Sequence, residues 1–207
     1  SPVADDLKKL RIFSNDFVNK FSLQAGFLWA DPLGVDDVDL RGEYVRIEPW
    51  IFTHKFPINT FRHFDAPLGH SLGPNGDRWS LSLGRKFSRD FEAMLEFGRT
   101  RRGSNVLLGE GSIHNVGGDL HYGWRPGDER EDKEFLAGNL HKWSRIGAAV
   151  SYRLIPRLHM SVGYHFEWGD NVPMPPRDGE ATPLQSRTGY GDGRQGEFAF
   201  DLRYGYL

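Results

Sequence analysis

The chain has 207 residues, a formal net charge of −2, with 26 Lys and Arg against 28 Asp and Glu, and no cysteine. This balance excludes the basic footprint of a nucleic-acid-binding protein, and the lack of cysteine excludes disulfides, thiolate catalysis and cysteine-based zinc sites. Aromatic residues are frequent at 14%. Apolar runs are too short for a transmembrane helix, although the composition leaves a membrane β-barrel open, because barrel strands are only half apolar.

The first fifteen residues differ from the rest of the chain. Asp5–Phe13 has acidic residues first and apolar residues at helical spacing, as in a short amphipathic helix. A truncated strand is the alternative for residues 1–15. Ser1–Ala4 lacks the charged and apolar regions of a signal peptide.

From residue 16 to residue 207, alternation of apolar and polar residues with period two is the dominant pattern, and it predicts β-strands. The pattern indicates about eight to nine strands in this chain. The segments that alternate are 21–29, 38–47, 78–87, 91–98, 116–124, 145–154, 158–169 and 197–206.

Strand length and the nature of the two faces favour an antiparallel transmembrane β-barrel, or a large part of one. Several predicted strands have ten or more residues, the length that spans the hydrocarbon core when tilted. One face is apolar with Trp and Tyr near the strand ends, as in an aromatic girdle, and the other combines charged residues with Gly and Ser. A soluble β-sandwich also has alternating strands, but its strands are usually shorter.

The predicted connections are of two kinds. Long loops are expected at 52–76, 102–115, 125–143 and 169–196, and short turns at 88–90 and 155–157. With eight strands, the two short turns would lie at opposite ends of the sheet. Either one strand is missing from the prediction, or one long connection lies on the periplasmic side; an even-stranded barrel also suggests that the chain forms only part of a sheet.

Catalytic and metal-binding patterns are weak, and no enzyme activity and no cofactor are predicted. His54, His63 and His70 share one loop but lack the spacing of a helical metal site, so no metal is expected. Ser71, His70 and Asp77 would have to converge to make a rim hydrolase, and no nucleophile-elbow motif surrounds the serine.

The loop that precedes the strand at 78–87 interleaves aromatic rings with hydrogen-bonding side chains. Sugar rings stack on aromatic faces and bond through their hydroxyls, so this loop is a candidate glycan site. Anchoring of the loop in a barrel mouth is the alternative. The candidate polysaccharide-binding residues are Trp50, His54, His63, His70, Asn75, Asp77 and Arg78.

Three segments resemble the C-terminal half of the Wzi-like capsule-assembly family of bacterial outer-membrane barrels: "VDLRGEYVRIEPWIFTH", "APLGHSLGPNGDRWSLSLGRKF" and "LEFGRTRRG". The resemblance covers Val38 to Gly103, and Gly69 to Asp77 is its most specific part. It implies a barrel that binds or anchors capsular or extracellular polysaccharide at the cell surface, without turnover. The chain departs from the usual aromatic final residue of such barrels, since it ends in Leu207.

The expected partners follow from this resemblance. They are outer-membrane lipid, surface polysaccharide, and the missing N-terminal half or another envelope protein, with no nucleic acid, and the expected location is the bacterial outer membrane. The alternative function is a porin-type or structural barrel subunit of a larger envelope complex without sugar specificity.

Overall fold

The computed structural model describes residues 20–54, 56–63, 66–108, 112–128, 133–173 and 190–204. The predicted helix or truncated strand at 1–15 lies outside these residues. The chain divides into two compact units. We call Ser1–Leu23, Arg46–Asp77 and Arg101–Leu140 the loop unit, and Gln24–Val45, Arg78–Thr100 and His141–Leu207 the sheet unit.

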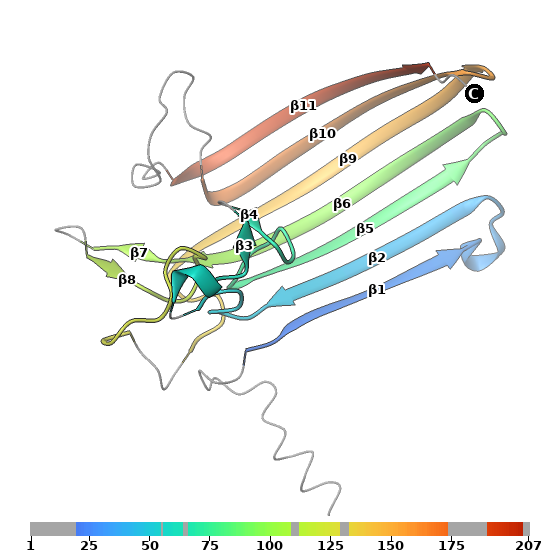
Figure 1. The fold of residues 1–207 in the computed structure, drawn as a ribbon. Helices are drawn as coiled ribbons and strands as arrows, with labels where there is room; N and C mark the ends of the chain where they lie inside the picture. Colours follow the sequence, from blue (N-terminus) through green and yellow to red (C-terminus); the bar gives the residue numbers. More distant parts are fainter. Residues whose placement is uncertain are drawn as a thin grey trace, which may run out of the picture. The chain divides into compact units, whose positions relative to one another are not determined.

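The protein is all-β, and its principal element is one antiparallel sheet of seven strands (Figure 1). Among these seven strands, neighbours in the sheet are also consecutive along the chain, in the order β1-β2-β5-β6-β9-β10-β11. The strands are β1 (Ser22–Ala30), β2 (Val38–Ile47), β5 (Gly76–Lys86), β6 (Phe91–Ser104), β9 (Asn139–Ile155), β10 (Leu158–Pro173) and β11 (Tyr190–Tyr204). Within the described residues the sheet is open, with β1 and β11 as its edges.

Alternation fixes the register at the β11 side of the sheet. Met160 pairs with Leu202, Val162 with Phe200 and Tyr164 with Phe198, so apolar side chains lie opposite apolar ones. The intervening positions pair polar or small residues. A shift by one residue would reverse both faces of the strand, and this two-faced pattern therefore specifies the register.

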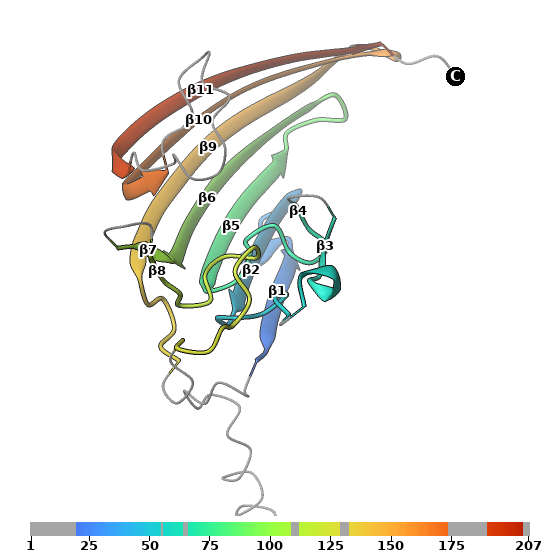
Figure 2. The same ribbon diagram turned by 60° about the vertical axis from the view of Figure 1, so that its left-hand side comes forward.

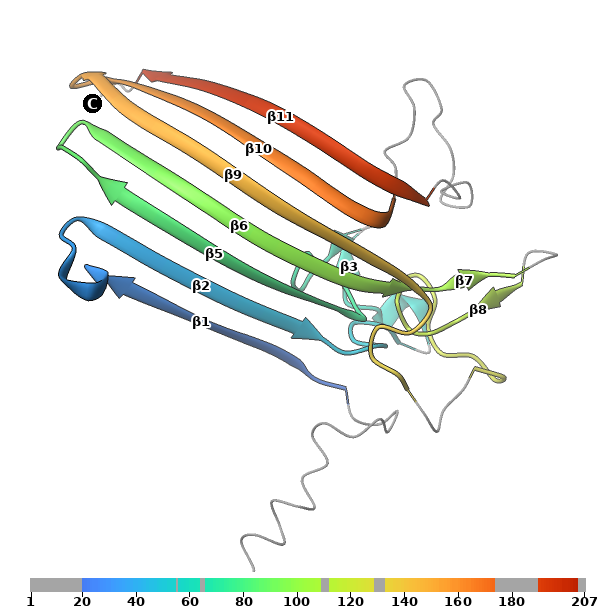
Figure 3. The ribbon, with the colours of Figure 1, turned by 180° about the vertical axis from the view of Figure 1, so that it is seen from behind.

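The connections between these seven strands sort by length, as the strands in Figure 3 show. The short connections are 31–37, 87–90 and 156–157, and all three join strands at the same end of the sheet. The long connections, 48–75, 105–138 and 174–189, join strands at the other end. The first short connection contains a 3₁₀ turn, η1 (Pro32–Gly34).

The predicted strand at 116–124 is wrong, and this error caused the apparent mismatch between the two short turns. Its backbone amides are taken by side chains: Asn105 Oδ1 accepts hydrogen bonds from the N–H groups of Val116 (3.0 Å) and Gly118 (3.3 Å). Gly117 also has a φ of +73°, outside the strand region. Without this segment, the prediction contains the seven strands of the principal sheet, and their connections alternate in length.

Several strands extend beyond the predicted limits. β6 continues to Ser104, β9 begins at Asn139, and β10 and β11 extend to Pro173 and from Tyr190, within segments predicted as loops. The remaining elements are short. They are η2 (Pro57–Asn59), β3 (Arg62–His63), β4 (Ala66–Pro67), β7 (Val106–Leu107) and β8 (Ile113–His114), with β3 paired to β4 and β7 paired to β8.

The two units differ in how they use apolar side chains. In the loop unit, Ile47, Trp50, Leu72 and Leu120 are buried and form a hydrophobic core. In the sheet unit, by contrast, most large apolar side chains are exposed. The turned view in Figure 2 shows the principal sheet as a single layer of strands.

Candidate functional site

The sheet unit has one face rich in exposed apolar side chains. Leu83 is 41% exposed, Ile146 51% and Phe200 60%, although each lies within a long strand. A soluble protein rarely leaves a continuous apolar face of this kind uncovered. We call this surface the apolar face. Its members include Leu81, Leu83, Leu95, Ile146, Val150, Tyr164, Phe198, Phe200 and Leu202.

A first aromatic cluster lies where the long connections join the strands. The ring centroids of Trp79 and Phe97 are 5.0 Å apart, and those of Phe97 and Trp168 are 6.5 Å apart. Phe166 stacks on Trp168 at 5.8 Å. The cluster crosses β5, β6 and β10, so aromatic rings from three strands gather at one level of the sheet.

A second aromatic cluster lies at the short-connection end. The ring centroids of Phe87 and Phe91 are 5.3 Å apart, and Phe91 is 6.4 Å from Tyr152. The guanidinium of Arg85 lies 5.2 Å from the centroid of the Phe87 ring. Trp and Tyr gather at both interfaces of transmembrane barrels, and long basic side chains extend toward the headgroups there.

The two clusters lie at two different levels along the strand direction. Trp79 and Phe87 are eight residues apart on the chain, which corresponds to roughly 27 Å along a strand at about 3.4 Å per residue. At a strand tilt of about 40°, the distance between the two aromatic levels is roughly 20 Å, close to the apolar band of about 25 Å in transmembrane barrels.

The opposite face of the sheet unit is polar, and several of its polar side chains pair across neighbouring strands. Arg145 Nε lies 3.6 Å from Glu167 Oε1, and His165 Nε2 lies 3.1 Å from Glu197 Oε2. The hydroxyls of Ser151 and Ser161 are 3.0 Å apart. These pairs join neighbouring strands, and opposite charges across strands stabilise a sheet modestly.

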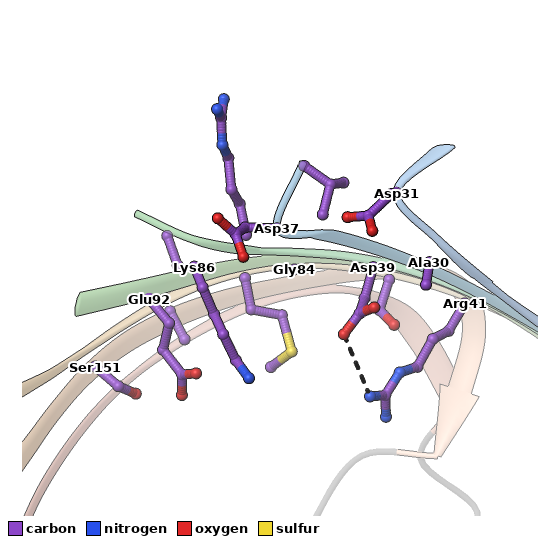
Figure 4. Close-up of a pocket in the computed structure, with 15 residues that line it drawn as sticks. Ala30, Asp31, Asp37, Asp39, Arg41, Gly84, Lys86, Glu92 and Ser151 are labelled. Atoms are coloured by element: carbon purple, nitrogen blue, oxygen red, sulfur yellow. Dashed lines mark ion pairs between the residues drawn. The ribbon is translucent and has the colours of Figure 1, made fainter. Parts of the chain in front are cut away.

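A recess of about 470 Å³ lies on the polar face near the short connections. Small residues such as Ser82, Gly84 and Ala149 line it together with charged side chains of both signs. Figure 4 shows Arg41 and Glu92 extending from the same side of the sheet, and Arg41 Nη2 is 3.9 Å from Asp39 Oδ2. This mixture suits water and polar solutes.

Three of the predicted polysaccharide-binding residues are buried in the loop unit. Trp50, Asn75 and Asp77 are 2%, 0% and 3% exposed. The Trp50 ring lies where a Cβ on Gly117 would stand, at 2.6 Å. Asp77 Oδ1 accepts a hydrogen bond from Arg101 Nε at 2.9 Å. These side chains hold the loop unit together.

Asn75 connects several segments of the loop unit. Its Nδ2 donates to the carbonyl oxygens of Gly103 and Ala137, both at 3.1 Å, and its Oδ1 accepts from the Leu136 N–H at 2.7 Å. The Asn75 backbone has a φ of +57°, a conformation that Asn tolerates better than most residues. The side chain therefore replaces a missing strand partner for three backbone groups.

The remaining predicted site residues are more accessible. His54 and His63 are exposed, and His70 is half-buried. His54 Nδ1 accepts from the Phe56 N–H at 3.0 Å, and His70 Nδ1 accepts from the Leu72 N–H at 3.1 Å. Arg78 belongs to the sheet unit, where its Nε donates to Thr100 Oγ1 at 3.2 Å. The structure thus does not gather the seven predicted residues around one cavity.

Sequence reasoning missed a polar and aromatic surface on segment 121–125. Tyr122 and Trp124 are half-buried, and the guanidinium of exposed Arg125 lies 5.1 Å from the Tyr122 ring centroid. His121 Nδ1 contacts Arg62 Nη1, which belongs to β3. The "HYGWRPGD" run, with Gly and Pro beside the aromatic residues, was the available signal for a loop.

A buried ionic cluster was also missed. Glu48 Oε2 lies 2.9 Å from Lys133 Nζ, and Glu48 Oε1 lies 2.7 Å from Arg46 Nη2. The side chains of Glu48 and Lys133 are 4% and 2% exposed, and the Arg46 guanidinium lies 3.8 Å from the centroid of the Phe135 ring. Desolvation, followed by the positive charge of Lys133, lowers the pKa of the Lys20 ammonium.

Among the described residues, no group of three or more His, Asp or Glu side chains has an arrangement that holds a metal ion. Within that same part of the chain, no helix has the length and apolar character required to cross a membrane. Comparisons with protein-family models, curated proteins and solved structures give no match. The resemblance to the Wzi-like family therefore stays a prediction.

Proposed function

We propose that this chain forms part of a bacterial outer-membrane β-barrel that binds or anchors capsular or extracellular polysaccharide at the cell surface. The observation that carries the membrane part is the apolar face between two aromatic clusters. Lipid covers such a face in full, and in lipid each backbone group of a strand is satisfied by its neighbours.

The sorting of connections supports the same proposal. Transmembrane barrels have short periplasmic turns and longer extracellular loops. Here the connections 31–37, 87–90 and 156–157 share one end of the sheet, and the long ones share the other. The long connections, which hold most of the loop unit, are thus the extracellular side under this proposal.

The polysaccharide part rests on accessible aromatic and polar side chains of the loop unit. Phe56 is 58% exposed, and its ring centroid is 5.8 Å from that of His54. Tyr122 and Arg125 supply a second ring with a neighbouring charge. Trp50 and Asn75 act as scaffold, so we place sugar contacts on the exposed residues, His54 and His63 included.

Binding measurements with the folded protein in detergent test this assignment. Saturable binding to one of a panel of bacterial surface polysaccharides is expected, weakened at least about tenfold in a Phe56→Ala/Tyr122→Ala variant, since loss of one stacking ring costs on the order of 1 kcal/mol. Ile58→Ala is the matched control, because Ile58 is 91% exposed in the same loop and lacks an aromatic ring. Equal affinity for the variant and the control would contradict the assignment.

The recess and the charged polar face favour one second candidate, a porin-type barrel subunit. A lumen lined by Asp39, Arg41, Lys86 and Glu92 suits the passage of ions and polar solutes. Ion conductance in planar bilayers, together with absence of polysaccharide binding, would support this candidate.

A further inference from the structure

The direction of the two edge strands limits what can complete the principal sheet. The sheet has seven antiparallel strands, so its first and last strands run in the same direction. The arrowheads of β1 and β11 point to the same end of the sheet in Figure 1. Direct pairing of β1 with β11 would therefore be parallel, whereas single-chain bacterial outer-membrane barrels are antiparallel with an even number of strands.

A second copy of the sheet does not remove this restriction. Suppose that two copies are inserted in a membrane with their long connections on the same side. The edge strands β1 and β11 of both copies then run in the same direction. Any contact between these edges, β1 with β11, β1 with β1 or β11 with β11, is then parallel. Antiparallel pairing requires one copy to be inverted, which would place its long connections on the opposite side of the membrane.

We propose that both edges of this sheet are completed by strands whose sequence differs from that of β1–β11, antiparallel to both edges and therefore odd in number. This inference rests on the proposed membrane barrel, because the membrane is what fixes a common orientation. The partner is a β-segment, since an uncovered edge would leave backbone N–H and C=O groups unpaired in lipid.

The edge strands also define the pattern that the added strands must have. On β11, Phe198, Phe200 and Leu202 belong to the apolar face, while Glu197 and Asp201 lie on the polar face. The strand beside β11 must place apolar residues opposite the first set and polar or small residues opposite the second. At the other edge, Phe27 packs over Gly42 of β2, where a Cβ would lie 2.3 Å from the ring, so the apolar face continues to β1.

Cysteine cross-linking tests the proposal with high specificity, because the chain has no cysteine of its own. Gln24→Cys lies on β1 and Ala199→Cys on β11, and both positions belong to the polar face of the sheet. The double variant, folded in detergent, is expected to form no disulfide within or between chains. The positive control is Gly163→Cys/Ala199→Cys, since these two positions are partners across β10 and β11 and should form a bond.

Hydrogen exchange of the unmodified chain gives an independent readout. Amides of β1 and β11 are expected to exchange at least about a hundredfold faster than those of the central strand β6, because each edge strand pairs on one side only within the described residues. A disulfide in the Gln24→Cys/Ala199→Cys variant, or edge strands as protected as β6, would overturn the proposal in favour of closure by the sheet itself or by a second copy. Failure of the chain to associate with phospholipid vesicles would instead contradict the membrane proposal.

Discussion

The destabilisation caused by Leu83→Arg distinguishes a sheet that faces lipid from one that faces water, because the expected losses of stability differ. Leu83 lies four residues from Trp79 of β5 and four from Phe87, which directly follows β5; each belongs to one of the two aromatic clusters. Four residues at about 3.4 Å, tilted by about 40°, place Leu83 roughly 10 Å from each aromatic level. Under the proposed membrane orientation, Leu83 therefore lies at the midplane of the apolar band.

The expected cost follows from that depth. Arg at the midplane of a transmembrane barrel destabilises it by about 2–4 kcal/mol, whereas surface substitutions in water usually change stability by less than about 0.5 kcal/mol. Leu83 is 41% exposed, so loss of packing contributes little in either case. Ser82→Arg is the matched control, because Ser82 is the neighbouring residue and lines the polar recess.

The assay is urea-induced unfolding of the protein in phospholipid vesicles, followed by fluorescence of its 6 tryptophans. Leu83→Arg should lower the free energy of unfolding by about 2–4 kcal/mol relative to Ser82→Arg. A difference below about 0.5 kcal/mol between the two variants would refute the assignment of the apolar face to lipid.

Three further predictions concern the loop unit. Asn75→Ala should destabilise it by about 3 kcal/mol, because three backbone groups, one buried and two half-buried, lose their partners at about 1 kcal/mol each. Increased protease susceptibility of the loops would show this loss. Glu48→Gln should lower the free energy of unfolding, measured by urea titration, by about 3–5 kcal/mol, because it leaves the buried Lys133 ammonium without its carboxylate. Lys133→Met should lower it less, because Glu48 keeps its ion pair with Arg46. Folding lowers the pKa of Lys20, so the unfolded chain binds the proton of the Lys20 ammonium more tightly than the folded chain does. The stability of the loop unit should therefore rise as the pH approaches the ordinary pKa of lysine. Lys20→Gln should abolish this rise.

Period-two alternation was sufficient to predict the seven long strands. A sheet with one apolar and one polar face requires apolar and polar residues to alternate along every strand. The pattern failed at 116–124, where alternate apolar residues occur but side-chain oxygens of Asn105 and Asn115 take the backbone amides. Capture of backbone amides by asparagine side chains leaves no periodic signal, and the glycines and the proline of residues 117–127 were the local indications of a break.

The candidate site was less predictable than the fold. Trp50 and Asn75 looked like ligand-binding residues because aromatic rings and amides serve both sugar binding and packing. Their burial depends on partners distant in the chain, such as Gly117 and Ala137, which sequence reading does not bring together. The same holds for the pair of Glu48 and Lys133, 85 residues apart in the numbering of the chain.

The most direct test of the proposed lipid-facing sheet is the environment of two neighbouring positions on the interior strand β9. Val150→Cys and Ala149→Cys would each carry a fluorescent label in protein inserted into vesicles; Val150 lies on the apolar face and Ala149 lines the polar recess. A lipid-soluble quencher should quench the label at 150 strongly and the label at 149 weakly, with the reverse order for iodide. Equal access of iodide to both positions would contradict the account.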